Sequence, residues 1–155
     1  MRALIVTGGL TALLSLAAAS TPALAGSEDV VVEGAWSRAS IGTTRPGAAY
    51  MTIRNTGDAP VALTGIATPL AMMSEIHETS TNAVGVTAMT PAGEIIIAPG
   101  GSVALEPGGL HVMLMQLQTP MMEGQAFPLT LLFDDGGEMT VEVPILSIAA
   151  RGPGD

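Results

Sequence analysis

Short stretches rich in Val, Ile, Leu and Thr, broken by Gly or Pro roughly every ten residues, dominate the chain after residue 29. No stretch keeps a helical period for long, and Gly and Pro are poor helix formers. Many short strands with regular turns are typical of a Greek-key β-sandwich or barrel. The sequence therefore predicts an all-β domain with strands over residues 30–35, 48–55, 61–66, 74–79, 84–89, 94–98, 102–106, 111–116, 127–133 and 138–144.

One of these predicted strands has an unusual pattern. Residues 127–133 are apolar at nearly every position, with Thr130 as the exception. Strands that are buried on both faces read as continuous apolar runs, whereas strands with one wet face alternate. We therefore expect this strand to be central and covered on both faces.

The first 25 residues have the pattern of a cleavable export signal. Arg2 gives a positive start, residues 3–19 form an apolar run, and residues 23–25 supply the small residues that signal peptidase requires. We expect residues 1–25 to be removed and residues 26–155 to form one domain in the periplasm. No cysteine follows the apolar run, so we expect no lipid anchor and no membrane anchor of any kind.

Charge and cysteine content narrow the possible functions. Residues 26–155 hold all 14 acidic residues and four arginines, without lysine. Such an acidic surface repels phosphate backbones, so we expect no nucleic acid partner. The absence of cysteine removes thiol nucleophiles, zinc thiolate sites and the cysteine ligand of blue-copper proteins. Neither histidine lies near a Gly-x-Ser-x-Gly elbow, so the sequence does not support an enzyme.

Methionine and histidine are the residues that could carry chemistry. In a strand over residues 111–116, side chains alternate between faces, so His111, Met113 and Met115 would share one face. Imidazole and uncharged thioether sulfur together suit Cu(I), whereas hard cations prefer oxygen ligands. A single His-x-Met pair also fits a structural role, because methionine often fills gaps in aliphatic cores.

The spacing of four such residues resembles the periplasmic copper chaperone family PCu(A)C. That family has a His and its neighbour, ten residues, a Met, twenty-one residues, and a His and Met one residue apart. His77, Met89, His111 and Met113 match this spacing at every ligand position. The resemblance extends over residues 30–145 through the segments 34–38, 47–53, 76–79 and 105–114.

This resemblance implies a cupredoxin-like β-sandwich that binds one Cu(I) ion, with Met115 as a candidate accessory residue. It implies copper delivery to the CuA site of apo cytochrome c oxidase subunit II, or to another copper-accepting periplasmic protein. The family's optional methionine beside the first histidine is Glu78 here, and the sequence has no His- and Met-rich tail. We therefore expect Cu(II) to bind weakly at most.

Two other functions remain open at this point. A copper buffer or tolerance protein would use the same four residues without a dedicated acceptor. A structural β-sandwich would carry its histidines and methionines incidentally. Four further methionines have no assigned role and could lie at the rim of the site, in the core or in loops: Met72, Met73, Met121 and Met122.

Overall fold

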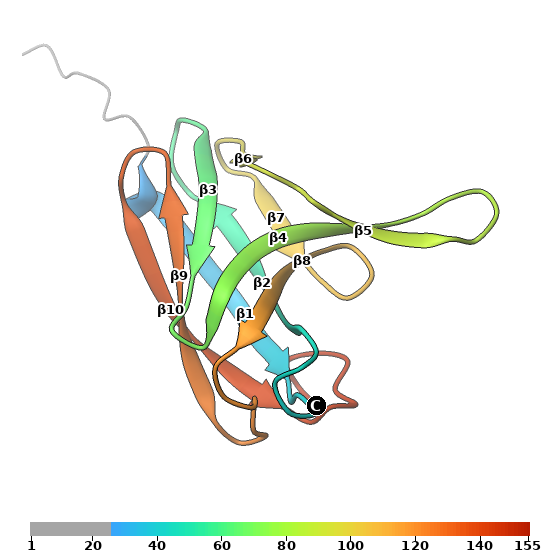
Figure 1. The fold of residues 1–155 in the computed structure, drawn as a ribbon. Coiled ribbons are helices and arrows are strands. Elements are labelled where there is room, and N and C mark those ends of the chain that lie inside the picture. The colour runs from blue at the N-terminus through green and yellow to red at the C-terminus, as the bar shows by residue number, and fades with distance from the viewer. Residues whose placement is uncertain (1–25) are drawn as a thin grey trace, which may run out of the picture.

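The computed structural model describes residues 26–155, so the predicted signal peptide lies outside the described residues. After a short 3-10 turn at Ser27–Asp29, all ten expected strands are present, and the all-β prediction is confirmed (Figure 1). Among residues 26–155, no helix is long and apolar enough to cross a bilayer. The strands are β1 (Val30–Arg38), β2 (Gly47–Asn55), β3 (Val61–Ala67), β4 (Ala71–Thr81), β5 (Thr87–Pro91), β6 (Ile95–Ile97), β7 (Ser102–Leu105), β8 (Leu110–Leu117), β9 (Ala126–Phe133) and β10 (Glu138–Leu146).

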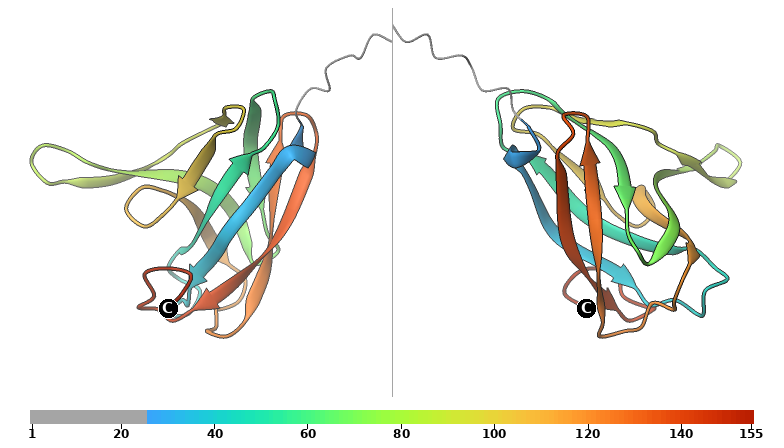
Figure 2. Two further views of the ribbon diagram at one scale, coloured as in Figure 1. Left: turned by 180° about the vertical axis from the view of Figure 1, so that it is seen from behind. Right: turned by 60° about the vertical axis from the view of Figure 1, so that its left-hand side comes forward.

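The strands follow one continuous path that folds into two layers (Figures 1 and 2). The order is β5-β4-β8-β2-β1-β10-β9-β3-β6, and β7 pairs with β2. The two layers join where β1 and β10 pair in parallel, through Ser37 with Ile145 and Arg38 with Leu146. Because one layer holds β4, β5, β8 and β2, residues far apart in sequence become neighbours on its surface.

The core lies between the layers and is mainly aliphatic. Strand β9 lies between β10 and β3, as expected of a central strand. Its buried positions alternate, however, with half-buried ones such as Pro128, Thr130 and Leu132. The expectation that this strand is covered on both faces is therefore wrong, because nothing packs closely over the outer face of a two-layer sandwich. The fully buried core side chains include Ile53, Leu63, Val112, Leu114, Leu129, Leu131 and Val143.

A bulge in β1 prepares a second, smaller cluster. The pairing of β1 with β2 shifts register between Glu33 and Trp36, and Gly34 in this interval has a φ of 60°. This left-handed conformation favours glycine, and bulges of this kind redirect the following side chains. Trp36 thereby pairs with Tyr50, and their rings lie 4.6 Å apart. The bulge sets the positions of the side chains that follow it in β1.

Strands β4 and β5 form a hairpin that projects from the body of the sandwich (Figures 1 and 2). The observed β4 is longer at both ends than the predicted strand over residues 74–79. Its first part pairs with β8, from Ala71 opposite Leu117 to Glu78 opposite Leu110. Beyond Glu78 it pairs with β5 alone, and all five residues of β5 are exposed. The hairpin is therefore anchored at one end only.

A buried asparagine closes the turn after β2. Asn55 is 0% exposed, and its side-chain amide donates hydrogen bonds to the carbonyl oxygens of Ala59 (2.7 Å) and Ile97 (3.1 Å). Its Oδ1 accepts from the amide of Gly57 at 2.9 Å. Asn82 lies in an exposed turn, where its Oδ1 accepts from the amides of Val84 (3.1 Å) and Val86 (2.9 Å). The two asparagines differ in burial, and only the Asn55 side chain also donates hydrogen bonds.

We expect Asn55→Ala to lower the free energy of unfolding by about 2 kcal/mol, because buried partners left without a hydrogen bond are costly. Asn82→Ala should cost less than about 1 kcal/mol, since water can replace the lost acceptor. Urea denaturation followed by Trp36 fluorescence measures both. Equal losses for the two variants would contradict this account of Asn55.

Candidate metal centre

Strand β8 places His111 and Met113 on the face opposite the core. The intervening Val112 and the following Leu114 are both 0% exposed and belong to the core. His111 is nonetheless only 7% exposed, and Met113 is half-buried. Strand alternation thus gives the two predicted ligands a common face, and neighbouring segments shield them from water.

The pairing of β4 with β8 brings the second histidine alongside the first. His77 lies directly opposite His111 in the antiparallel register, and opposed residues project from the same face. Their ring centroids are 6.3 Å apart, and the rings are inclined at 46°. His77 is 8% exposed. The next pair on this face is Glu75 opposite Met113, so a carboxylate also lies within the group.

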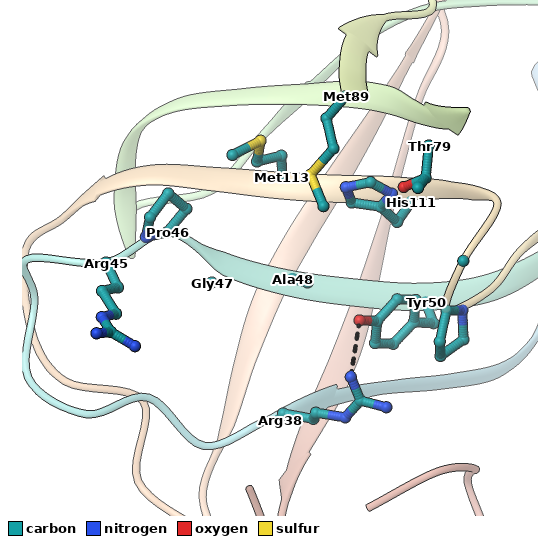
Figure 3. Close-up of a pocket in the computed structure, with 12 residues that line it drawn as sticks. Arg38, Arg45, Pro46, Gly47, Ala48, Tyr50, Thr79, Met89, His111 and Met113 are labelled. Carbon is teal, nitrogen blue, oxygen red and sulfur yellow. Dashed lines mark hydrogen bonds between the residues drawn. The ribbon is translucent and has the colours of Figure 1, made fainter. Parts of the chain in front are cut away.

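Met89 reaches the same face from the projecting hairpin. It pairs with Thr79 of β4 and is 54% exposed. Its thioether extends toward His111 and Met113, and these three residues line one pocket of about 450 Å³ (Figure 3). His77 is not among the residues that line this pocket. The structure therefore gathers three of the four predicted ligands around one hollow and places the fourth beside His111.

The one side-chain hydrogen bond of His77, to Glu75, defines which ring nitrogen is free. Its Nε2 lies 3.2 Å from Oε2 of Glu75, and an ionised carboxylate can only accept, so Nε2–H donates. In the neutral ring, Nδ1 then carries the lone pair. This Nδ1 is buried and has no hydrogen-bond partner. A buried nitrogen left unsatisfied costs about 1–3 kcal/mol, which a bound cation would offset.

His111 is held in the complementary way. Its Nδ1 lies 3.0 Å from the carbonyl oxygen of Gly109, which accepts its proton, so Nε2 carries the lone pair. Histidines that bind metals usually donate their other ring N–H to a carboxylate or a backbone carbonyl, which fixes the tautomer and the ring. Here His77 donates to a carboxylate, that of Glu75, and His111 donates to a backbone carbonyl, that of Gly109.

The remaining predicted candidates divide between the surface and the core. Met115 is half-buried and pairs with Met73 on the face of the predicted ligands, but it does not line the pocket. Met121 is 0% exposed and packs against Gly47, where an added Cβ would collide with its sulfur. Met72 and Met122 are 70% and 54% exposed. Among residues 26–155, no group of three or more His, Cys, Asp or Glu is placed to hold a metal ion.

Sequence reasoning missed the residues around the predicted ligands. Glu75 could have been identified, because it lies two positions before His77 and therefore on the same strand face. Three other residues line the pocket: Arg38, Arg45 and Tyr50. Arg38 and Tyr50 lie in segments that resemble the family, but nothing in the sequence placed them beside the ligands, and Arg45 left no signal. Their contribution depends on the pairing of β1 and β2 beside β8.

Arg38 is fixed beside the aromatic pair. Its Nε donates to the carbonyl oxygen of Ala150 at 2.6 Å, and its Nη1 lies 3.4 Å from the Tyr50 hydroxyl (Figure 3). The guanidinium carbon is 5.4 Å from the Trp36 ring centroid and 5.5 Å from that of Tyr50. Burial raises the pKa of the Tyr50 phenol above 10.0, and the Arg38 charge partly opposes this by favouring the phenolate.

Comparison with known proteins identifies related sequences. The chain matches a family described as "LpqE-like: Putative lipoprotein LpqE-like" over residues 30–145. It is 35% identical over 130 residues to "Putative lipoprotein Lxx21020" from Leifsonia xyli subsp. xyli, covering 83% of this chain and 76% of that protein.

Solved structures show the same fold. Apo-DR1885 from Deinococcus radiodurans has a TM-score of 0.59 and 31% identity, over 95% of this chain and 97% of that one. CuI-DR1885 has a TM-score of 0.56 and 33% identity, over 83% of each chain. The apo PmoF2 PCuAC domain has a TM-score of 0.66 at 24% identity, over 80% of this chain and 94% of that one, which supports the fold alone. The predicted cupredoxin-like β-sandwich is confirmed.

The single tyrosine of the chain allows the Arg38 contact to be tested. We expect Tyr50 to titrate above pH 10.0 and Arg38→Gln to raise its pKa further, because the charge that favours the phenolate is lost. A raised phenol pKa stabilises the fold below pH 10.0, and this stabilisation is lost as the pH rises through the folded-state value. Absorbance of the phenolate measures the titration. Arg54→Gln is the control and should leave it unchanged, whereas a lower Tyr50 pKa in Arg38→Gln would contradict the assignment.

Proposed function

This chain belongs to the LpqE-like family, and on that premise we propose that it is a periplasmic copper carrier rather than an enzyme. Its likeness to PCuAC domains, some of them described as copper-bound, supports a copper-binding domain. The proposed site holds one Cu(I) ion between His77, Met89, His111 and Met113.

The state of the two imidazoles is the observation that carries this proposal. Each ring donates one N–H to a fixed acceptor, Glu75 or the Gly109 carbonyl, and keeps the other nitrogen for a ligand. On His77 that other nitrogen is buried without a partner. A structural histidine would instead satisfy both nitrogens or expose one to water. The pair therefore has the form expected of metal ligands.

The sulfur atoms select the metal. Met89 and Met113 supply soft, uncharged donors beside the imidazoles, and thioether sulfur suits Cu(I) better than Zn(II), Mg²⁺ or Ca²⁺. Cu(I) has a filled d shell and no ligand-field preference, so a distorted cage with ligands from three strands is acceptable. Thioethers also suit an oxidising compartment, where a pair of thiols could form a disulfide.

The exposure of the ligands fits delivery rather than permanent storage. Both histidines are almost fully buried, whereas Met89 is 54% exposed on a hairpin anchored at one end. A receiving protein could replace this thioether first and then take the ion by exchange. The proposed acceptor is the CuA site of apo cytochrome c oxidase subunit II or another copper-accepting periplasmic protein.

Export is supported by two observations. The family and its Leifsonia relative are described as putative lipoproteins, and lipoproteins are exported proteins. The first 25 residues also have the sequence pattern of a signal peptide. This chain contains no cysteine, the residue that carries the lipid in bacterial lipoproteins. We therefore propose a protein released into the periplasm.

The site is tested first by titrating the purified protein with Cu(I) under anaerobic, reducing conditions against a competing chelator. We expect one tightly bound equivalent in the wild type and none in the double variant His111→Ala, Met113→Ala. Met89→Leu should weaken binding by about tenfold or more, because one of four donors is lost. Met122→Leu is its control, since Met122 has the same 54% exposure and lies outside the pocket. Cu(I) binding that is unchanged by all these substitutions would favour the alternative of a structural β-sandwich with incidental histidines and methionines.

A second experiment separates a carrier from a copper buffer. In a strain that lacks this protein, we expect cytochrome c oxidase activity to fall under copper limitation and to recover with the wild-type gene. The His111→Ala, Met113→Ala variant should not restore it. Loss of copper tolerance with normal oxidase activity would instead identify the buffer. A tight, stoichiometric Cu(II) complex would contradict the expectation that the site prefers Cu(I).

A further inference from the structure

Positive charge is scarce in this protein, and two of the four arginines of residues 26–155 lie beside the proposed copper site. The sequence carries a net charge of −9, and residues 26–155 hold only four arginines. Among the residues that the structure describes, Arg54 is the only arginine in an ion pair, 3.3 Å from Glu33. Within residues 26–155, no carboxylate lies within ion-pairing distance of Arg38 or Arg45. Both arginines line the pocket that Met89 and His111 also line.

Arg38 is held in place by groups that leave its charge uncompensated. It is half-buried, its Nε is bonded to the Ala150 carbonyl, and its plane packs near Trp36 and Tyr50. A guanidinium has five N–H donors, and these contacts use two of them. The remaining donors keep the fork geometry that matches a carboxylate. A partly desolvated charge of this kind gains most when a partner supplies the opposite charge.

The two arginines line the same pocket as three of the proposed copper ligands. Met89, His111 and Met113 form one part of its lining, and Arg38 and Arg45 form another, with the start of β2 between them (Figure 3). The four proposed copper ligands are neutral, and the charge of Cu(I) would offset that of the Glu75 carboxylate beside His77. The pocket lining itself holds Arg38 and Arg45 and no carboxylate. The pocket is therefore a positive region on an acidic protein. A protein that approached this copper with carboxylates beside its own ligands would be attracted here and repelled elsewhere.

We propose that Arg38 and Arg45 form a docking surface for acidic side chains of the copper-accepting protein, next to the point of transfer. This inference rests on the proposed function, because it assumes that copper leaves through this pocket. Arg38 supplies the fixed, bidentate contact. Arg45 is exposed and supplies a longer-range attraction. The pair orients the acceptor so that its ligands meet the exposed Met89.

The test compares copper transfer from the wild type, Arg45→Gln and Arg54→Gln to the apo copper-accepting domain of cytochrome c oxidase subunit II. At low salt we expect Arg45→Gln to transfer about tenfold more slowly, with the difference disappearing in high salt as the charges are screened. Arg54→Gln removes the same charge away from the pocket and should transfer at the wild-type rate. Arg38→Gln should be slower still, provided that its circular dichroism and urea transition show a folded protein.

A neutral acceptor provides the matched control for the mechanism. Transfer to neocuproine, an uncharged Cu(I) chelator, should be equally fast from the wild type and Arg45→Gln. If Arg45→Gln also slows this transfer, Arg45 acts on the copper site itself and the docking surface is overturned. Equal rates for Arg45→Gln and Arg54→Gln with the protein acceptor, or no transfer from any of the proteins, overturn it as well.

Copper affinities measured beforehand separate this inference from the proposed function. A wild-type protein that holds no Cu(I) contradicts the proposed function, and the docking surface falls with it. A protein that holds Cu(I) and transfers it to the protein acceptor at low salt at a rate independent of Arg45 contradicts the docking surface alone.

Discussion

The antiparallel pairing of β4 with β8 is the constraint on which the candidate site depends. It sets His77 opposite His111 and Glu75 opposite Met113. A slip of one residue would move every side chain of β4 to the other face and separate the two imidazoles. The register is secured from the core side, where Val112 and Leu114 of β8 are fully buried and Ile76 of β4 lies beside them. Hydrophobic packing on one face therefore positions the chemistry on the other.

The site combines buried imidazoles with an exposed thioether, and this difference has a structural origin. His77 and His111 lie in the part of the sheet where β4 and β8 are paired. Met89 lies on β5, which has only β4 as a neighbour and contributes no buried residue. Elements with few buried contacts open at low free-energy cost. A metal site with its most exposed ligand on such a hairpin can exchange its ion while its other ligands remain in place.

Charge adds a second level of organisation to the same surface. The protein is strongly acidic, yet the pocket beside His111 contains two of the four arginines of residues 26–155. Arg38 reaches this position because the bulge at Gly34 redirects β1, and the carbonyl of Ala150 near the C-terminal end holds its guanidinium. The same bulge positions Trp36 against Tyr50. A single local irregularity thus sets both the small aromatic cluster and the fixed charge next to the proposed site.

Local patterns determined much of this protein. Turn residues and strand alternation predicted all ten strands, and the alternation in β8 predicted that His111, Met113 and Met115 share a face, because both depend on neighbours in sequence. The spacing of four residues also indicated the candidate ligands. The expected double burial of β9 was wrong, since an apolar run does not reveal whether a second layer covers it. The contact of Glu75 with His77, the burial of Met121 and the bond from Arg38 to Ala150 were decided by the tertiary structure. These features depend on which strands pair and in what register, and pairing reflects the packing of the whole sheet rather than any single segment.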